Sequence, residues 1–159
     1  GKCVRELRGH TNYVKSLIRL KNGKIASCSR DSTVKIWDLE KGKCLHTLKG
    51  HTSIVYALAE LPDGRIASAS VDKTIKLWRD QTCEATLTGH TSYVTCLAVL
   101  PDGTLASGSL DKTIKLWNTK DGACVRTFTH HTDGVRALAV LKDGTLLSGS
   151  WDNTVKALR

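Results

Sequence analysis

A histidine, a serine and an aspartate recur together four times in this chain of 159 residues. In the first copy they are His10, Ser27 and Asp31, and their order and spacing return in each later copy. These residue types could form a nucleophilic triad, in which the imidazole takes the serine proton and the carboxylate orients the imidazole. The other copies are His51, Ser68 and Asp72; His90, Ser107 and Asp111; and His131, Ser148 and Asp152.

Fourfold repetition of this set argues against catalysis. An enzyme needs one such site, with donors for the oxyanion and a cleft for the substrate, and nothing in the chain distinguishes one copy as that site. The choice of serine also stays open, because a second serine lies two residues further on and on the same face of the strand. These alternatives are Ser29, Ser70, Ser109 and Ser150.

The histidines and aspartates belong to a longer repeat. Residues 61–78 return, with changes, as residues 20–37, 100–117 and 141–158. A fixed period of about 40 residues is typical of solenoids, propellers or arrays. Each copy contains Asn-Gly or Asp-Gly, which favours a tight hairpin. Two segments rich in small and β-branched residues follow that turn, so we expect strands throughout and no helix.

The repeated residues resemble those of the WD40 repeat family. Gly-His occurs at 9–10, 50–51 and 89–90, and a tryptophan ends the first three units at Trp37, Trp78 and Trp117. Among the ends of the units, only Trp37-Asp38 is a literal Trp-Asp pair, and Leu158 replaces the tryptophan of the fourth unit. The resemblance implies an all-β propeller with four-stranded blades around a central channel. It also implies that each His, Ser and Asp forms a buried, structural hydrogen-bonded tetrad with the tryptophan.

The resemblance further divides the chain into blades. Residues 9–49, 50–88 and 89–129 are expected to form blades 1, 2 and 3, and residues 130–159 a blade 4 without its outer strand. Residues 1–8 match the outer strand at 42–49 but have no preceding blade. Because WD40 rings usually have seven or eight blades, we expect a twofold homodimer of eight blades. In it, residues 1–8 of each chain complete blade 4 of the other.

Two function classes follow. The first is a non-catalytic half-propeller that self-assembles into a ring and serves as an interaction scaffold. The close likeness of the repeats is also typical of an engineered array, or of one excised from a longer protein. The alternative is a recognition module for an acidic, phosphorylated or ubiquitin-like partner. The segments Leu-Pro-Asp-Gly, Ser-Gly-Ser-Trp-Asp and Asp-Lys-Thr-Ile-Lys-Leu-Trp resemble blades of propellers that bind ubiquitin.

The resemblance places partner binding on the top face, around the channel mouth. Tyrosine, arginine and tryptophan, which dominate interface energetics, are frequent at the matching positions, although each tyrosine could simply pack on its neighbour. Lys15, Arg30 and Arg136 could receive an acidic or phosphorylated peptide. The candidate set is Tyr13, Lys15, Arg30, Ile54, Tyr56, Val71, Tyr93, Thr95, Leu110, Gly134, Arg136 and Trp151.

Charge and cysteine content suggest no other class of function. The net charge is +9, but lysines such as Lys35, Lys76, Lys115 and Lys156 are one strand position copied four times, so we do not expect nucleic-acid binding. The six cysteines contain no Cys-x-x-Cys pair. We therefore expect no disulfide, metal or cofactor, and interpret Cys28 and Cys96 as small buried hydrophobes. No apolar run approaches the roughly 18 residues that span a bilayer, so an intracellular, cytoplasmic protein is expected.

Overall fold

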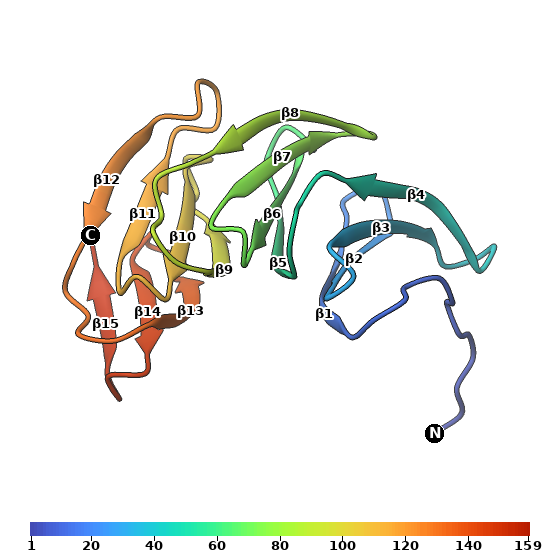
Figure 1. The fold of residues 1–159 in the computed structure, drawn as a ribbon, viewed down its shortest axis with the longest axis horizontal. Coiled ribbons are helices and arrows are strands. Elements are labelled where there is room, and N and C mark those ends of the chain that lie inside the picture. Colours follow the sequence, from blue (N-terminus) through green and yellow to red (C-terminus); the bar gives the residue numbers. More distant parts are fainter.

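The computed structural model describes residues 1–159 and folds them into four antiparallel sheets without any helix. The sheets, which we call blades 1 to 4, follow one another along an arc, and each is a simple meander (Figure 1). The first strand of each blade lies on the inside of the arc and the last strand on the outside. The predicted all-β propeller architecture is therefore confirmed.

The strands have the following bounds. Blade 1 contains β1 (Val14–Arg19), β2 (Ile25–Ser29), β3 (Thr33–Asp38) and β4 (Lys43–Lys49). Blade 2 contains β5 (Val55–Glu60), β6 (Ile66–Ser70), β7 (Ile75–Arg79) and β8 (Thr82–Leu87). Blade 3 contains β9 (Val94–Val99), β10 (Leu105–Ser109), β11 (Ile114–Trp117) and β12 (Cys124–Phe128). Blade 4 contains β13 (Val135–Val140), β14 (Leu146–Ser150) and β15 (Val155–Leu158).

The turn between the first two strands of each blade is the predicted Asn-Gly or Asp-Gly hairpin. In blade 2, Gly64 has a φ of 84° and donates its amide hydrogen to the carbonyl of Leu61 at 3.0 Å. The three counterparts of Gly64 have φ angles between 82° and 87°. Glycine adopts this left-handed conformation without a steric penalty, which explains why all four repeats carry it. The four hairpins therefore place the first two strands of every blade in the same register.

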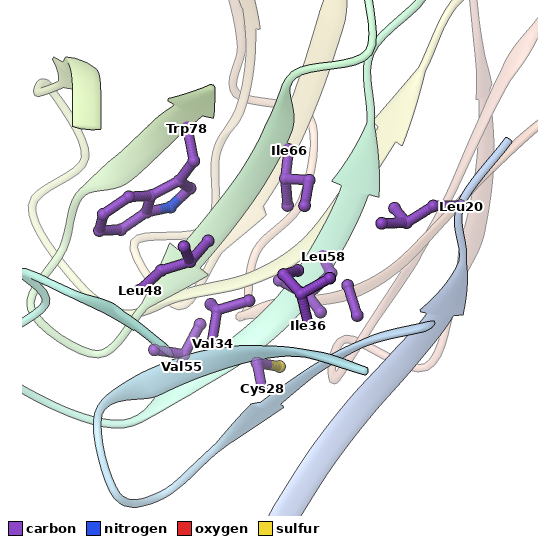
Figure 2. Close-up of a cluster of buried hydrophobic side chains, with 10 residues drawn as sticks. Leu20, Cys28, Val34, Ile36, Leu48, Val55, Leu58, Ile66 and Trp78 are labelled. Carbon is purple, nitrogen blue, oxygen red and sulfur yellow. The ribbon is translucent and has the colours of Figure 1, made fainter. Parts of the chain in front are cut away.

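The hydrophobic core lies between blades. Each of three clusters of buried side chains joins one blade to the next. In the first cluster, side chains from blade 1 such as Val34 and Leu48 face Leu58 and Trp78 of blade 2 (Figure 2). A blade without a neighbour therefore leaves one side of such a cluster uncovered.

All six cysteines are free thiols. Cys28 belongs to the core between blades 1 and 2, and Cys96 to the core between blades 3 and 4, as predicted for small buried hydrophobes. Burial raises the pKa of the Cys28 thiol to about 12 and that of Cys96 to about 11. Both thiols are therefore uncharged at neutral pH and act as packing groups. Cys83 is half-buried and packs against the core between blades 1 and 2, and Cys3, Cys44 and Cys124 are exposed.

The two ends of the chain lie at opposite ends of the arc (Figure 1). Residues 1–13 form no strand, and the tail is tied to blade 1 by a 3.0 Å hydrogen bond from Arg5 to the carbonyl of Glu40. Blade 4 has three strands, so the outer edge of β15 has no partner strand. The assignment of residues 1–8 as an outer strand remains a prediction, because these residues pair with no strand of this chain.

Candidate functional site

The histidine, serine, aspartate and tryptophan of blade 2 form one chain of hydrogen bonds. His51 Nδ1 lies 2.7 Å from Asp72 Oδ2, and His51 Nε2 lies 2.8 Å from Ser68 Oγ. Because a carboxylate only accepts, Nδ1 carries the donated hydrogen and Nε2 accepts from the serine hydroxyl. The indole nitrogen of Trp78 donates to Ser68 Oγ at 2.8 Å. The chain therefore runs from indole to hydroxyl to imidazole to carboxylate.

Blades 1 and 3 repeat this arrangement. The His–Asp and His–Ser distances are 2.7 and 2.8 Å in both blades, and the indole donates to the serine at 2.7 Å in blade 1 and 2.8 Å in blade 3. Blade 4 keeps His131, Ser148 and Asp152 at the same distances. The side chain of Leu158 has no N–H group, so the hydrogen-bonded set of blade 4 lacks its indole donor.

The second serine of each middle strand has a different role. Ser29 Oγ donates to the carbonyl of Asn12 and accepts from the amide of Asp31, both at 3.0 Å. Ser70, Ser109 and Ser150 make the same kind of contacts to the loop before the first strand and to the aspartate turn. Ser27 and its counterparts therefore occupy the position next to histidine, which resolves the choice that the sequence left open.

The electrostatics of the blade 2 set favour a charged aspartate and a neutral histidine. Burial alone would raise the pKa of Asp72, but hydrogen bonds from Thr74 and His51 outweigh it and hold that pKa below its usual value. Burial lowers the pKa of His51, against the raising effect of Asp72. The hydroxyl of Ser68 is fully buried beneath the indole that donates to it. A substrate has no path to that oxygen. Ser107 and Ser148 are buried to the same degree, whereas His10 and Ser27 of blade 1 border an open groove. Because the geometry of blade 1 is the same as that of the other blades, we interpret all four sets as structural.

The outward face of blade 1 is an apolar surface whose residues were not identified from the sequence. We call Val14, Leu17, Ile25 and Trp37 the leading face. Leu17 is 65% exposed, whereas its counterpart Leu58, packed against blade 1, is 6% exposed. These residues line an open groove of about 440 Å³, which Leu7 of the tail also borders. The sequence could have indicated this face, because the residue at each of its four positions is apolar in every repeat.

The outward face of blade 4 is the complementary surface. We call Leu141, Leu147, Val155 and Ala157 the trailing face. Val155 is 74% exposed, whereas its counterpart Val34 is 1% exposed in the core between blades 1 and 2. The leading and trailing faces therefore correspond to the two sides of the same buried junction. Large exposed apolar patches on a protein mark interaction sites.

The predicted top-face residues differ in accessibility. Tyr13, Lys15, Arg30, Tyr93, Arg136 and Trp151 are exposed, and Ile54, Tyr56, Val71 and Leu110 are half-buried. The other two predicted residues, Thr95 and Gly134, cannot present a side chain to a partner. Thr95 is buried, and its hydroxyl donates to the carbonyls of Gly108 and Val135. Its inclusion among the binding residues is corrected, because that hydroxyl is used to join blade 3 to blade 4.

The packing of neighbouring side chains explains why residue 134 is glycine. It is buried, and a Cβ atom built there would lie 2.7 Å from a methyl carbon of Leu110 and 3.4 Å from the ring of Trp151. Tyrosine or isoleucine occupies this position in the other blades, and neither would fit here. The missing side chain leaves space that Trp151 and Leu110 occupy.

Cations and aromatic rings gather on this face from three blades. The guanidinium carbon of Arg136 in blade 4 lies 5.0 Å from the ring centre of Trp151 and 5.6 Å from that of Tyr56 in blade 2. Lys15 Nζ of blade 1 lies 5.4 Å from the centre of the same Tyr56 ring. Such contacts hold long cationic side chains in place beside the channel. The arrangement presents positive charge and aromatic surface together.

No group of three or more histidine, cysteine, aspartate or glutamate side chains is arranged to hold a metal ion. No helix has the length and apolar character needed to cross a membrane.

Comparison with known proteins connects this geometry to a family. The family described as "WD domain, G-beta repeat" matches residues 1–38, 42–79, 81–118 and 122–157. A 41-residue segment is 54% identical to nuclear distribution protein PAC1 of Candida glabrata, covering 26% of this chain and 9% of that protein. Another 41-residue match is 44% identical to THO complex subunit 6 of Drosophila melanogaster, covering 26% of this chain and 12% of that protein.

The solved structures extend the likeness to the fold. The crystal structure of the WD40 beta propeller domain of Doa1 matches with a TM-score of 0.89 and 29% sequence identity. The match covers 95% of this chain and 52% of that chain. The chain thus spans about half of this solved propeller and about a tenth of the two curated relatives.

Proposed function

This chain belongs to the WD40 repeat family, and from that premise we propose that two copies of it close an eight-bladed ring. Propellers of this family are typically non-catalytic scaffolds that bind proteins or peptides. The working form in our proposal is a twofold homodimer, in which each chain contributes four blades. An intracellular location is part of the proposal, supported by the name of the nuclear distribution protein that one segment resembles.

One observation carries this proposal: the exposed faces at the two ends are the two halves of a junction that the chain already uses. Leu17 and Val155 stand where Leu58 and Val34 pack against each other's blades inside the chain. Fully burying one such side chain contributes roughly 1.5–3 kcal/mol. The ring has two junctions between the copies, which we call seams, and each seam joins a trailing face to a leading face. The free energy gained by burial therefore applies twice.

The shape of the chain supports the same closure. The four blades superpose on about half of a solved propeller, so they follow about half of a circle. The chain ends lie at opposite ends of the arc, where a twofold axis would bring the end of one copy to the start of the other (Figure 1). Two identical contacts then close the ring and leave no sheet face uncovered.

Light scattering on the intact chain tests the proposal. We expect twice the mass of one chain at micromolar concentration, because closure covers both apolar faces. The measurement also distinguishes the other occupant of these faces, which is further blades of a longer protein. A compact, well-folded monomer at that concentration would contradict ring closure and favour that second occupant.

A second candidate function is recognition of an anionic peptide on the top face. The stacking of Arg136 between Tyr56 and Trp151 favours it, because a cation already fixed in place loses little freedom on binding. Lys15 and Arg30 are exposed on the same face. An acidic or phosphorylated peptide, or a ubiquitin-like protein, would meet charge-assisted donors there.

The double change Tyr93→Ala with Trp151→Ala tests this second function. It should abolish binding of acidic and phosphorylated peptides, because both rings are exposed on the face that would receive them. The fold should be kept, because neither ring belongs to the cores between blades. Fluorescence anisotropy with labelled peptides measures the loss, and circular dichroism checks the fold. The matched control is Leu45→Ala with Val125→Ala, two exposed residues of outer strands. Loss of binding in the control, with binding kept in the double variant, would move the site to the outer rim.

A further inference from the structure

A lysine on the third strand of each blade normally donates to the outer strand. The ammonium groups of Lys35, Lys76 and Lys115 lie 2.8, 2.9 and 3.0 Å from a threonine hydroxyl. The threonines are Thr47, Thr86 and Thr127, each directly opposite its lysine in the antiparallel register. The outer strand therefore supplies a fixed acceptor at one position.

Blade 4 has the lysine without the acceptor. Lys156 lies on β15 at the same position, and its ammonium group makes no hydrogen bond or ion pair within the chain. The strand that would face it is absent from this sheet. The half-buried lysine is therefore left without the contact that its three counterparts make.

The tail carries a different acceptor at that position. Residues 1–8 align with the outer strand at 42–49, so Glu6 stands where Thr47 stands. The register of blade 1 pairs Val34 with Leu48 and Lys35 with Thr47. Applied to the seam of the proposed ring, it puts Val155 opposite Leu7 and Lys156 opposite Glu6 of the second copy. Glu6 is the one acid at a position that is otherwise threonine.

Resting on the proposed ring, we propose that Glu6 of one chain and Lys156 of the other form an ion pair that sets the register of the exchanged strand and selects a second copy as its partner. We call this contact the register pair. Opposite charges facing each other across neighbouring strands stabilise the pairing, and like charges there oppose it. An ammonium–carboxylate hydrogen bond is also stronger than the ammonium–hydroxyl bond of the inner blades.

The contact available to Glu6 in the single chain is weak by comparison. Its carboxylate lies 3.0 Å from the guanidinium of Arg8, and both side chains are largely exposed to water. Exposed pairs of this kind contribute little to stability. Exchanging the contact with Arg8 for one with Lys156 therefore costs Glu6 little free energy. The seam also buries the neighbouring Leu7 against Val155.

Charge reversal on each side of the pair tests the inference in the intact chain. In Glu6→Lys alone, or Lys156→Glu alone, both seams of a homodimer would contain two like charges. We expect the dimer dissociation constant to rise about tenfold or more in each variant, because two pairs change from attraction to repulsion. When the two variants are mixed, each seam of the mixed dimer joins one acid and one base. Dimers should then return, and every one should contain both variants.

Native mass spectrometry with one variant carrying a mass tag measures the composition directly. The matched control is Lys115→Glu, the same substitution at the same strand position inside blade 3, which should dimerise like the parent and show no preference for Glu6→Lys. Mixed dimers formed from variants that do not dimerise alone also show that both variants fold. Random mixing, or variants that stay monomeric when mixed, would overturn the register pair while the parent dimer stands. A monomeric parent would overturn the ring and the pair together.

Discussion

Removing residues 1–8 should convert the dimer into monomers or aggregates. In the proposed ring these residues form the outer strand of the partner's blade 4, and Leu7 covers Val155. Without them, the outer edge of β15 has unpaired backbone groups beside the exposed apolar side chains of the trailing face. An unpaired edge recruits other strands, so aggregation is the expected fate of part of the sample. Light scattering after size exclusion measures the change.

The control for this deletion keeps the strand and changes its sequence. Replacing residues 1–8 with a copy of residues 42–49 restores the repeated pattern of apolar side chains, with threonine in place of Glu6. This variant should dimerise, less tightly than the parent if the register pair contributes. A truncated chain that forms dimers as tightly as the parent would show that the tail takes no part in closure.

The change Asp72→Ala should lower the free energy of unfolding by roughly 1–3 kcal/mol, or more because the lost group is charged. The carboxylate accepts from the imidazole of His51, the amide of Thr52, and the amide and hydroxyl of Thr74, at 2.7 to 3.1 Å. Alanine leaves these donors without a partner in a site that water reaches poorly. Urea denaturation monitored by tryptophan fluorescence measures the loss.

A turn aspartate gives the matched comparison. Asp102 is exposed and accepts from the amide of Thr104 at 2.9 Å. Its replacement by alanine should change stability by less than about 0.5 kcal/mol, as is usual for a surface site. The structural interpretation would fail if Asp72→Ala kept the parent's stability and instead abolished a hydrolytic activity. That outcome would make the tetrads candidate catalytic groups.

The repeated spacing in the sequence predicted an array of strands, and the resemblance to WD40 repeats implied the propeller and the histidine, aspartate and tryptophan of the tetrads. Each histidine and its aspartate are 21 positions apart, with a hairpin between them, so the register of the sheet brings them together. Glycine after asparagine or aspartate predicted the hairpins, because its backbone accepts positive φ. These features are local, and four copies made each of them visible four times.

The aligned repeats also predict that residues 1–8 match an outer strand. Blade 4 of the structure has three strands. The position of Glu6 among three threonines is likewise readable from the aligned repeats. The contact that we propose for Glu6 cannot be read from the repeats alone, because it follows from applying the register of blade 1 to Lys156.

Only the tertiary structure decided which side chains are available for binding. Thr95 and Tyr93 occupy equally plausible top-face positions, but blade 4 covers Thr95 and leaves Tyr93 exposed. Ser27 and Ser29 have the same type and strand face, and the position of the Trp37 indole distinguishes them. Leu17 is as apolar as Leu58, and its exposure follows from the absence of a blade beside it. The differences at Thr95 and Leu17 depend on contacts between blades about 40 residues apart, and the difference between the two serines depends on Trp37 of the same blade. The period of a single strand encodes neither kind of contact.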